Sequence, residues 1–569
     1  MKEIHSVGEN LSQCGVYTMV PENVKKVFEK NPFFLRYMHL IPIERIGVPD
    51  YYETPTRDLG DLPQPNLIYP LTNDCFVHIY PDPEDMRQFY IPIEPSFTID
   101  VDHIVKEVEK KLLDFTEELE FASSDEDKEK ALLNILDSVC VPSTKRGDKN
   151  NGERGALSLS GLFRRNNNDK VFLTPEELEA VKYLIVRDKV GLGVLEPFIR
   201  DPYIEDISCS GLGRIFVEHK IFKGLKSTMS FASHEDLDDF VLRLAEKIKK
   251  PVTVHNPVAD ATLPDGSRIN IVYGTDVSKR GSNFTIRKFM GTPISIVQLV
   301  DFGTMDYMAA AYLSLVIEGG MNLFVSGETA SGKTTTMNAL TTFIPPEDKI
   351  VSIEDTPELQ VPHHNWIREV ATAGGGGTVS MFGLLKAALR QRPDMIIIGE
   401  IRGEEGNIAF QAMQTGHACM STFHAASVEK LIQRLTGDPI KVPKMFVDNL
   451  NVVVIQSAVQ LANGKTARRV LSISEIVGFD VASQAFSFVD IFNWESGKDK
   501  LRFVGNMNSY LLEEKVAMKR GYSREKRREI YKELKQRAKI LERLHKEKGV
   551  TDFYDLLQVI SAARRQGVF

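Results

Sequence analysis

One short segment limits the fold of this chain more than any other: residues 327–334, with the sequence GETASGKT. It matches the pattern G-x-x-x-x-G-K-[ST], and it stands between an apolar run at 323–325 and a helical segment at 335–342. In such a loop the backbone N–H groups point at phosphate oxygens, the lysine reaches the terminal phosphates and the hydroxyl can bind Mg²⁺. The residues expected to bind a nucleotide are Gly327, Glu328, Thr329, Ala330, Ser331, Gly332, Lys333, Thr334 and Thr335.

Two further apolar runs end in carboxylates. Residues 395–398 lead to Glu400, and residues 350–353 lead to Glu354 and Glu358. Because strand-like runs alternate with helical segments here, we expect a parallel sheet with crossover helices, whose strands deliver these acids to one edge. An acid at that edge can hold Mg²⁺ through water or polarise the attacking water, but several acids together need a metal or an arginine to neutralise them.

Two histidines, His417 and His424, flank another strand-like run. Each alone would more often be a packing or surface residue than a catalytic one. Their spacing of seven residues fits no zinc motif.

The length of 569 residues predicts three or more folded units. Thr174, followed by Pro175 and two acids, predicts a helix start after an exposed linker, and residues 123–128 predict a turn between two earlier helices. The expected division is an accessory region at 1–95, a helical segment at 96–141, a linker at 142–170, an α+β domain at 171–291, an α/β domain at 292–510 and a basic helical tail at 511–569.

The tail has an apolar stripe on one side and crowded cations on the other. The stripe predicts a helix packed on the neighbouring domain, while the cations leave open a contact with acidic lipid or a partner. The stripe residues are Ile530, Leu534, Ala538, Leu541 and Leu544.

Charge and cysteine content restrict the setting of the chain. The chain has 70 Lys and Arg against 78 Asp and Glu, which gives a net charge of −8. This balance argues against binding of nucleic acid through the overall charge of the protein. Five cysteines without a Cys-x-x-Cys pair fit a reduced, cytoplasmic setting. No apolar run reaches about 18 residues, so we expect any membrane contact to be peripheral.

Four segments in this order resemble the motifs of the secretion ATPase superfamily, the motors of type II and type IV secretion and of pilus and archaellum assembly. They are a Walker A motif at 327–334, an Asp box at 352–358, a Walker B motif at 395–400 and a His box at 415–424. Upstream, residues 201–207, 263–268 and 284–288 resemble the N-terminal domain of that family. The amino acids in several of the motifs resemble those of its archaeal branch more closely.

The resemblance implies a RecA-like P-loop ATPase core joined to a PAS-like N-terminal domain, assembled as a homo-hexamer with ATP and Mg²⁺. It further implies a cytoplasmic motor, peripherally associated with the cytoplasmic membrane, that acts on a polytopic membrane platform protein.

The resemblance also implies roles for individual residues. Thr334 and Glu400 would hold Mg²⁺, and Glu358, with Glu354 close behind, would activate water. His417 or His424 would sense phosphate. The expected phosphoryl-neutralising arginines are Arg268 and Arg287, with Arg280 a third candidate.

The predicted function is therefore Mg²⁺-dependent ATP hydrolysis that powers filament assembly or type II-like secretion. Two alternatives remain at this point: a ring scaffold that binds ATP and hardly hydrolyses it, and a RecA-type nucleic-acid translocase. The acidic charge balance and the absence of a basic and aromatic stripe outside the tail argue against the translocase.

Overall fold

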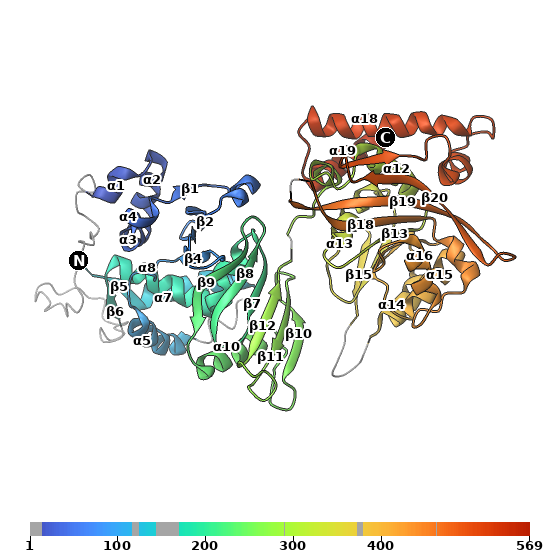
Figure 1. Cartoon of the computed structure of the whole chain (residues 1–569). Coiled ribbons are helices and arrows are strands. Elements are labelled where there is room, and N and C mark those ends of the chain that lie inside the picture. The colour runs from blue at the N-terminus through green and yellow to red at the C-terminus, as the bar shows by residue number, and fades with distance from the viewer. Residues whose placement is uncertain (1–13, 116–123, 144–169, 290, 372–378, 463) are drawn as a thin grey trace, which may run out of the picture. The chain divides into compact units, whose positions relative to one another are not determined.

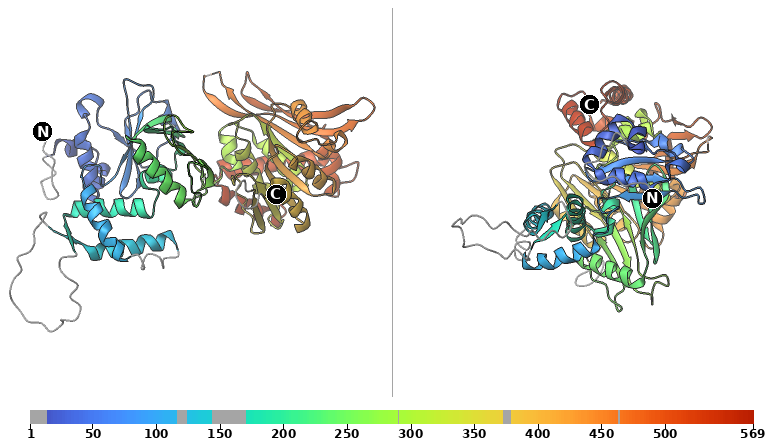
Figure 2. Two further views of the ribbon diagram at one scale, coloured as in Figure 1. Left: turned by 90° about the horizontal axis from the view of Figure 1, so that it is seen from below. Right: turned by 90° about the vertical axis from the view of Figure 1, so that its left-hand side faces the viewer.

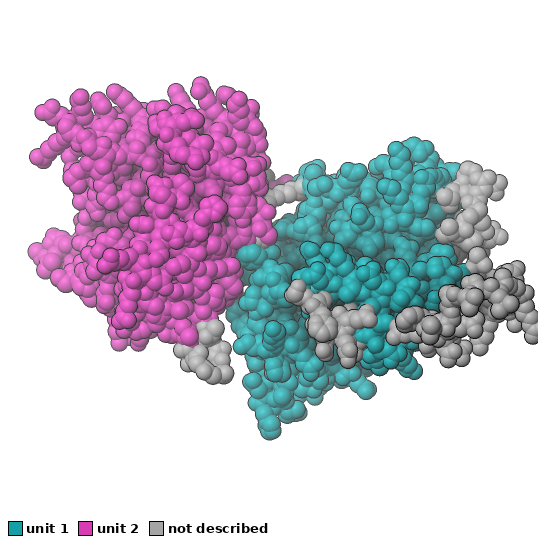
Figure 3. Space-filling model, turned by 180° about the vertical axis from the view of Figure 1, so that it is seen from behind, with its two compact units in different colours: residues 1–289 teal, residues 290–569 magenta. Residues whose placement is uncertain are grey.

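The computed structural model describes residues 14–115, 124–143, 170–289, 291–371, 379–462 and 464–569. The chain divides into two compact units, Met1–Phe289 and Met290–Phe569, shown in teal and magenta in Figure 3. The predicted boundaries at 95, 141 and 170 fall inside the first unit, and the boundary at 510 falls inside the second. Each unit is mixed α/β and contains one large sheet.

The first unit contains a ten-stranded sheet in the order β1-β2-β3-β4-β9-β8-β7-β12-β11-β10 (Figure 1). Strands predicted at 75–80, 88–93, 214–218, 268–272 and 284–287 are all present. The strand bounds are β1 Asp50–Tyr51, β2 Leu67–Thr72, β3 Cys75–Tyr80, β4 Phe89–Ile93, β7 Ile204–Cys209, β8 Gly213–His219, β9 Lys223–Phe231, β10 Val258–Thr262, β11 Arg268–Val272 and β12 Asn283–Arg287.

The strands before residue 95, β1 to β4, share this sheet with β7 to β12, because β4 pairs with β9 in parallel. A buried carboxylate reinforces the join: the hydroxyls of Tyr69 on β2 and Tyr90 on β4 donate to Asp201 Oδ2 at 2.7 and 2.8 Å. Burial raises the pKa of Asp201, and the two hydroxyls oppose that rise. The accessory strands are thereby fixed to the segment 201–207.

Both faces of β2, β3 and β4 are covered. Ile68, Phe76 and Ile91 pack against the N-terminal helices, while Tyr69 and Val77 belong to the core on the other face. Burial on both sides explains why these strands read as nearly continuous apolar runs. The N-terminal helices are α1 Gly15–Met19, α2 Glu22–Lys30, α3 Pro32–Leu40 and α4 Ile43–Ile46.

Three helices, α5 Asp102–Leu112, α7 Asp125–Val139 and α8 Pro175–Lys189, share a separate core (Figure 2). Thr174 and Glu177 form a capping box at the start of α8, which confirms the predicted helix start. The turn predicted at 123–128 is wrong, because Ser124 caps α7 and the following acids favour the helix N-terminus. Most of the predicted linker lies outside the described residues, but its flanks pair in parallel as β5 Cys140–Pro142 and β6 Val171–Leu173.

The second unit contains a nine-stranded sheet in the order β15-β14-β16-β17-β13-β18-β19-β20-β21. Its pairs from β15 to β18 are parallel, as the alternating pattern predicts. The bounds are β13 Leu323–Gly327, β14 Ile350–Glu354, β15 Trp366–Val370, β16 Met395–Glu400, β17 Ala418–Phe423, β18 Val452–Gln460, β19 Thr466–Asp480, β20 Ala485–Glu495 and β21 Lys500–Phe503.

The strand predicted at 470–473 is not part of the parallel array. It lies within β19, which pairs antiparallel with β18, and β20 and β21 continue the antiparallel part. The reason is the short connection between β18 and β19, which is too short for the crossover that parallel pairing requires.

Helices cover both faces of this sheet (Figure 1). One core includes residues of α11 Ile296–Asp301, α12 Tyr307–Glu318, α13 Lys333–Leu340, α18 Ile530–Lys546 and α19 Phe553–Arg565, and the other includes residues of α14 Met381–Ala388, α15 Glu405–Gln414 and α16 Val428–Thr436. Four of the five stripe residues of the tail are buried in the first core and Leu544 packs against it, which confirms the packed interpretation. Among the described residues, no helix is long and apolar enough to cross a membrane.

Candidate nucleotide site

The predicted phosphate loop connects the buried strand β13 to helix α13. Gly332 has φ +91°, a left-handed conformation that favours glycine. Gly327 allows a close backbone approach, since a Cβ there would lie 2.0 Å from the carbonyl oxygen of Gln456. The two glycines of the motif are therefore required by the local geometry.

Lys333 is the first residue of α13 and is 8% exposed. Its Nζ donates to the carbonyl oxygen of Glu328 at 2.9 Å and lies 3.5 Å from His424 Nδ1. Burial lowers the pKa of Lys333, while the Glu400 carboxylate opposes this shift. Of the other loop residues, Ser331 is buried, Thr334 and Thr335 are half-buried, and Glu328, Thr329 and Ala330 are exposed.

The carboxyl ends of β13, β14, β16 and β17 lie at one edge of the sheet, because these strands pair in parallel. Glu400 ends β16, and His424 directly follows β17. Their side chains meet, with His424 Nε2 2.9 Å from Glu400 Oε1. Burial lowers the pKa of His424, and Glu400 opposes that shift. This edge therefore brings Lys333, His424 and Glu400 into one continuous series of contacts.

Arg402 is a member of this cluster that the sequence analysis missed. One of its terminal nitrogens donates to Glu400 Oε2 at 2.5 Å, and the other donates to Asp355 Oδ2 at 2.9 Å. It thus supplies the arginine that crowded acids were expected to need. The available signal was its position two residues after Glu400.

The two Asp-box glutamates have different environments. Glu354 is 1% exposed, and its Oε1 accepts the backbone N–H groups of Glu358 and Leu359 at 2.7 and 2.8 Å. Its Oε2 is buried, has no hydrogen-bond partner among the described residues and lies 3.5 Å from Arg368 Nε. Burial raises the pKa of Glu354 to about 7. Glu358 is half-buried, and its backbone oxygen accepts from Asn338 of α13. Glu354 therefore shapes the loop that carries Glu358.

The two histidines lie at opposite ends of β17, since His417 precedes Ala418 and His424 follows Phe423. A strand of six residues spans roughly 20 Å. His417 contacts Thr415, with Oγ1 and Nδ1 3.1 Å apart. The structure brings His424 to Lys333 and Glu400 and leaves His417 at the other edge of the sheet.

The predicted arginines lie in the first unit. Arg268 on β11 and Arg287 on β12 are direct cross-strand partners, and both side chains are on the exposed face. Arg268 forms a two-point contact with Asp260, at 3.1 Å from Nε and 2.6 Å from a terminal nitrogen. Within the described part of the chain, Arg287 has no carboxylate at ion-pair distance. Arg280 is exposed in the turn before β12.

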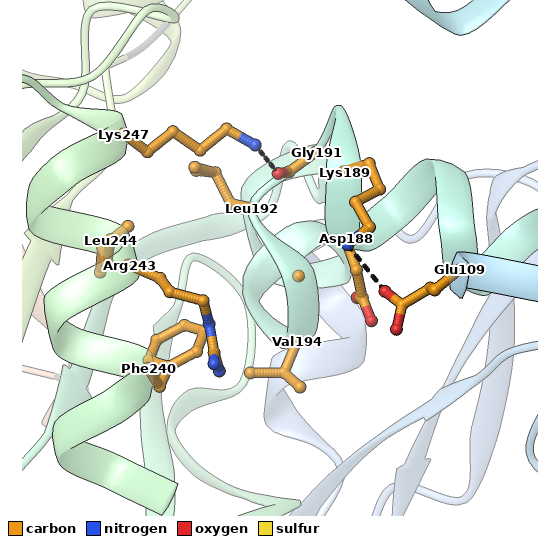
Figure 4. A pocket seen from close by; sticks show the side chains of 11 residues that line it. Glu109, Asp188, Lys189, Gly191, Leu192, Val194, Phe240, Arg243, Leu244 and Lys247 are labelled. Carbon is orange, nitrogen blue, oxygen red and sulfur yellow. Dashed lines mark hydrogen bonds and ion pairs between the residues drawn. The ribbon is translucent and has the colours of Figure 1, made fainter. Parts of the chain in front are cut away.

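A cavity of about 360 Å³ also lies in the first unit, and neither Arg268 nor Arg287 lines it (Figure 4). Figure 4 shows Phe240 and Arg243 on α10 His234–Lys247 facing the loop 191–194, with Lys247 bonded to the carbonyl oxygen of Gly191. Apolar side chains, among them Leu192, Val194 and Leu244, line the cavity together with five charged ones, Glu109, Asp188, Lys189, Arg243 and Lys247. None of the predicted site residues is among them.

Comparison with known proteins adds independent evidence. The family model described as type II/IV secretion system protein matches residues 188–567. An uncharacterized protein of Methanocaldococcus jannaschii is 44% identical over 556 residues, 97% of this chain and 98% of the relative. The VirB11 protein of Agrobacterium fabrum is 29% identical over 41% of this chain and 76% of its own length.

Two solved structures are also similar to this chain. The VirB11 ATPase of the Brucella suis type IV secretion system is 24% identical, with a TM-score of 0.26, and the match covers 49% of this chain and 91% of that one. The pilus retraction motor PilT is 18% identical, with a TM-score of 0.36, and the match covers 52% of this chain and 83% of that one.

Proposed function

This chain belongs to the type II/IV secretion system protein family and is an ATP-binding ATPase, and we propose that it is a homo-hexameric, Mg²⁺-dependent motor. Its ATP hydrolysis would power assembly of type IV pilus- or archaellum-like filaments, or type II-like secretion, through a polytopic membrane platform protein. The observation that carries the proposal is the series of contacts from Lys333 through His424, Glu400 and Arg402 to Asp355.

The residues at the sheet edge fit ATP and Mg²⁺. Mg²⁺ usually takes one or two protein oxygens together with phosphate oxygens and water, and Thr334 and Glu400 would supply the protein oxygens. When bound, the metal neutralises charge on the transferred phosphoryl group. The backbone of residues 327–335 would hold the phosphates, with Lys333 at the terminal ones.

Each remaining residue has a role that its environment supports. Glu358 would orient the attacking water, because Glu354 is already bonded to the backbone of the loop. His424 would detect the terminal phosphate, since it contacts both Lys333 and Glu400. Arg268 and Arg287 would neutralise the charge that develops on the phosphoryl group.

The proposed location is the cytoplasmic face of the cytoplasmic membrane, with peripheral attachment. Lys532, Lys535 and Lys539 lie on the exposed side of α18, and none of them has a carboxylate at ion-pair distance in the described part of the chain. Such a row of cations can contact acidic lipid headgroups. We expect no role for nucleic acid.

The test is steady-state ATP hydrolysis by the full chain across a range of protein concentrations, with Lys333→Ala as the blank and Glu400→Gln as a second variant. A motor whose sites require assembly should show turnover per chain that rises with concentration and falls by roughly 100-fold or more in both variants. Tight ATP binding without turnover, even with a membrane fraction present, would instead support the ring scaffold. Stimulation by single-stranded DNA would support the translocase.

A further inference from the structure

The antiparallel part of the second sheet continues past the phosphate loop. β13 ends at Gly327, which pairs with Gln456 on β18, while β18 continues to Gln460. β19 pairs with this extension, with Arg468 opposite Ala458. The ends of β18 and β19 therefore lie beside the loop 327–334.

Gln456 holds the loop from this extension. Its side chain is 1% exposed, its Nε2 donates to the carbonyl oxygen of Ser331 at 2.8 Å, and its Oε1 accepts from the hydroxyl of Thr336 at 2.7 Å. One amide thus joins the loop to the first turn of α13.

Arg468 makes a second contact further along the loop. Its Nε donates to the carbonyl oxygen of Ala330 at 3.0 Å, and its Cδ lies 3.2 Å from where a Cβ on Gly332 would be. Ala330 has φ +61°, which is uncommon for a residue with a side chain. Arg468 is exposed, and no carboxylate of the described residues lies at ion-pair distance from it. Arg468 therefore donates a hydrogen bond to the carbonyl oxygen of Ala330, a residue with an uncommon backbone conformation. It also places an unneutralised positive charge beside the loop.

We propose that Arg468 is a positioning residue for ATP, supplied by the antiparallel part of the sheet. A phosphate loop works by directing its N–H groups inward, so a bond to the Ala330 carbonyl oxygen from outside favours that orientation. The guanidinium also adds positive charge next to the triphosphate, which favours binding of the anion. Both effects act before the reaction, and they predict an influence on ATP affinity and not on the chemical step.

The experiment measures KM and kcat for ATP, and Kd for ATP without turnover, in the full chain carrying Arg468→Ala or Arg468→Lys. We expect Arg468→Ala to raise KM and Kd about tenfold and to change kcat by less than about twofold. Arg468→Lys, which keeps a positively charged donor, should stay within about threefold of wild type. Inorganic tripolyphosphate, used as a competitor, should lose affinity for Arg468→Ala by the same factor as ATP.

Arg502→Ala is the matched control, because Arg502 is an exposed arginine of the same sheet on β21. It should leave KM unchanged. The proposal is wrong if Arg468→Ala binds ATP as tightly as wild type, if kcat falls while KM does not change, or if Arg468→Lys is as weak as Arg468→Ala. Loss of ATP affinity without loss of tripolyphosphate affinity would also overturn it, since the contact would then involve the nucleoside. None of these outcomes affects the motor proposal, which depends on wild-type turnover.

Discussion

The two charged surfaces of this chain differ in how their charges are balanced. At the carboxyl edge of the parallel strands, Lys333, His424, Glu400 and Arg402 contact one another in series. The Glu400 carboxylate acts on the cations on both sides of it, since it contacts Arg402 and raises the pKa of Lys333 against the effect of burial. On the exposed face of β11 and β12, two arginines lie directly opposite each other across the strands, and like charges in that arrangement are destabilising. The first surface is neutralised by contacts among its own members. On the second, Arg268 pairs with Asp260, while Arg287 lies opposite Asp206 on β7 without an ion pair between the two side chains.

This difference indicates what each surface needs from a ligand. In a balanced cluster, a side chain can give up the contact with its neighbour and contact a phosphate or a metal instead. Such a cluster suits repeated binding and release of a ligand. An anion bound beside both arginines would relieve the repulsion between Arg268 and Arg287, because Arg287 has no carboxylate at ion-pair distance in the described part of the chain. Arginines that neutralise a phosphoryl group would have this property.

The largest expected effect tests the arginine surface. Arg287→Ala and Arg268→Ala should each lower kcat for ATP on the order of 100-fold, because an arginine that stabilises transition-state charge acts mainly on the chemical step. ATP affinity, measured by equilibrium binding, should change by less than about threefold. Lys250→Ala, which removes an exposed cation elsewhere in the same unit, is the control. Equal losses of affinity and turnover would show that these arginines do not act on the transition state.

A smaller effect should separate the two ends of β17. His424→Ala should lower kcat roughly tenfold, because it removes the side chain that links Lys333 to Glu400. His417→Ala should stay within about twofold of wild type, since the His417 side chain contacts Thr415 and lies at the opposite end of β17 from His424. Steady-state turnover of the two variants side by side decides the matter, and a larger loss in His417→Ala would reverse the assignment.

The sequence predicts the parallel half of the second sheet well, for a physical reason. Glu400 follows an apolar run, as do the Asp-box acids, and parallel strands bring such residues to one edge by geometry alone. Periodicity cannot distinguish His417 from His424, because both flank the same strand.

Other features depend on pairings between distant segments. The join of β4 with β9 involves residues more than 130 positions apart, and no local pattern encodes it. The contacts of Arg402 and Arg468 depend on the direction of their side chains, which the sequence does not show. Arg468 in addition lies on an antiparallel strand, which the alternation of strands with helices does not predict. Arginines are common on surfaces, so their type alone gives no signal.

The smallest effect concerns stability at the balanced edge. Burial raises the pKa of Glu354 from 4.5 to about 7, so the folded chain holds this proton more tightly than the unfolded chain between those values. The contribution of Glu354 to stability is therefore fully present below about pH 4.5 and falls as the pH rises toward 7.

Glu354→Gln keeps an oxygen that can accept the N–H groups of Glu358 and Leu359, and it cannot ionise. We expect the variant to be more stable than wild type by about 3 kcal/mol at pH 8 and nearly equal to it near pH 4.5. Urea unfolding followed by tryptophan fluorescence measures this in the second unit alone, because both tryptophans, Trp366 and Trp494, lie there. Glu404→Gln, at an exposed acid of the same unit, should show no such pH dependence. If the stability difference between Glu354→Gln and wild type does not change with pH, the Glu354 carboxylate is stabilised as an anion, and Arg368 is the side chain placed to do so.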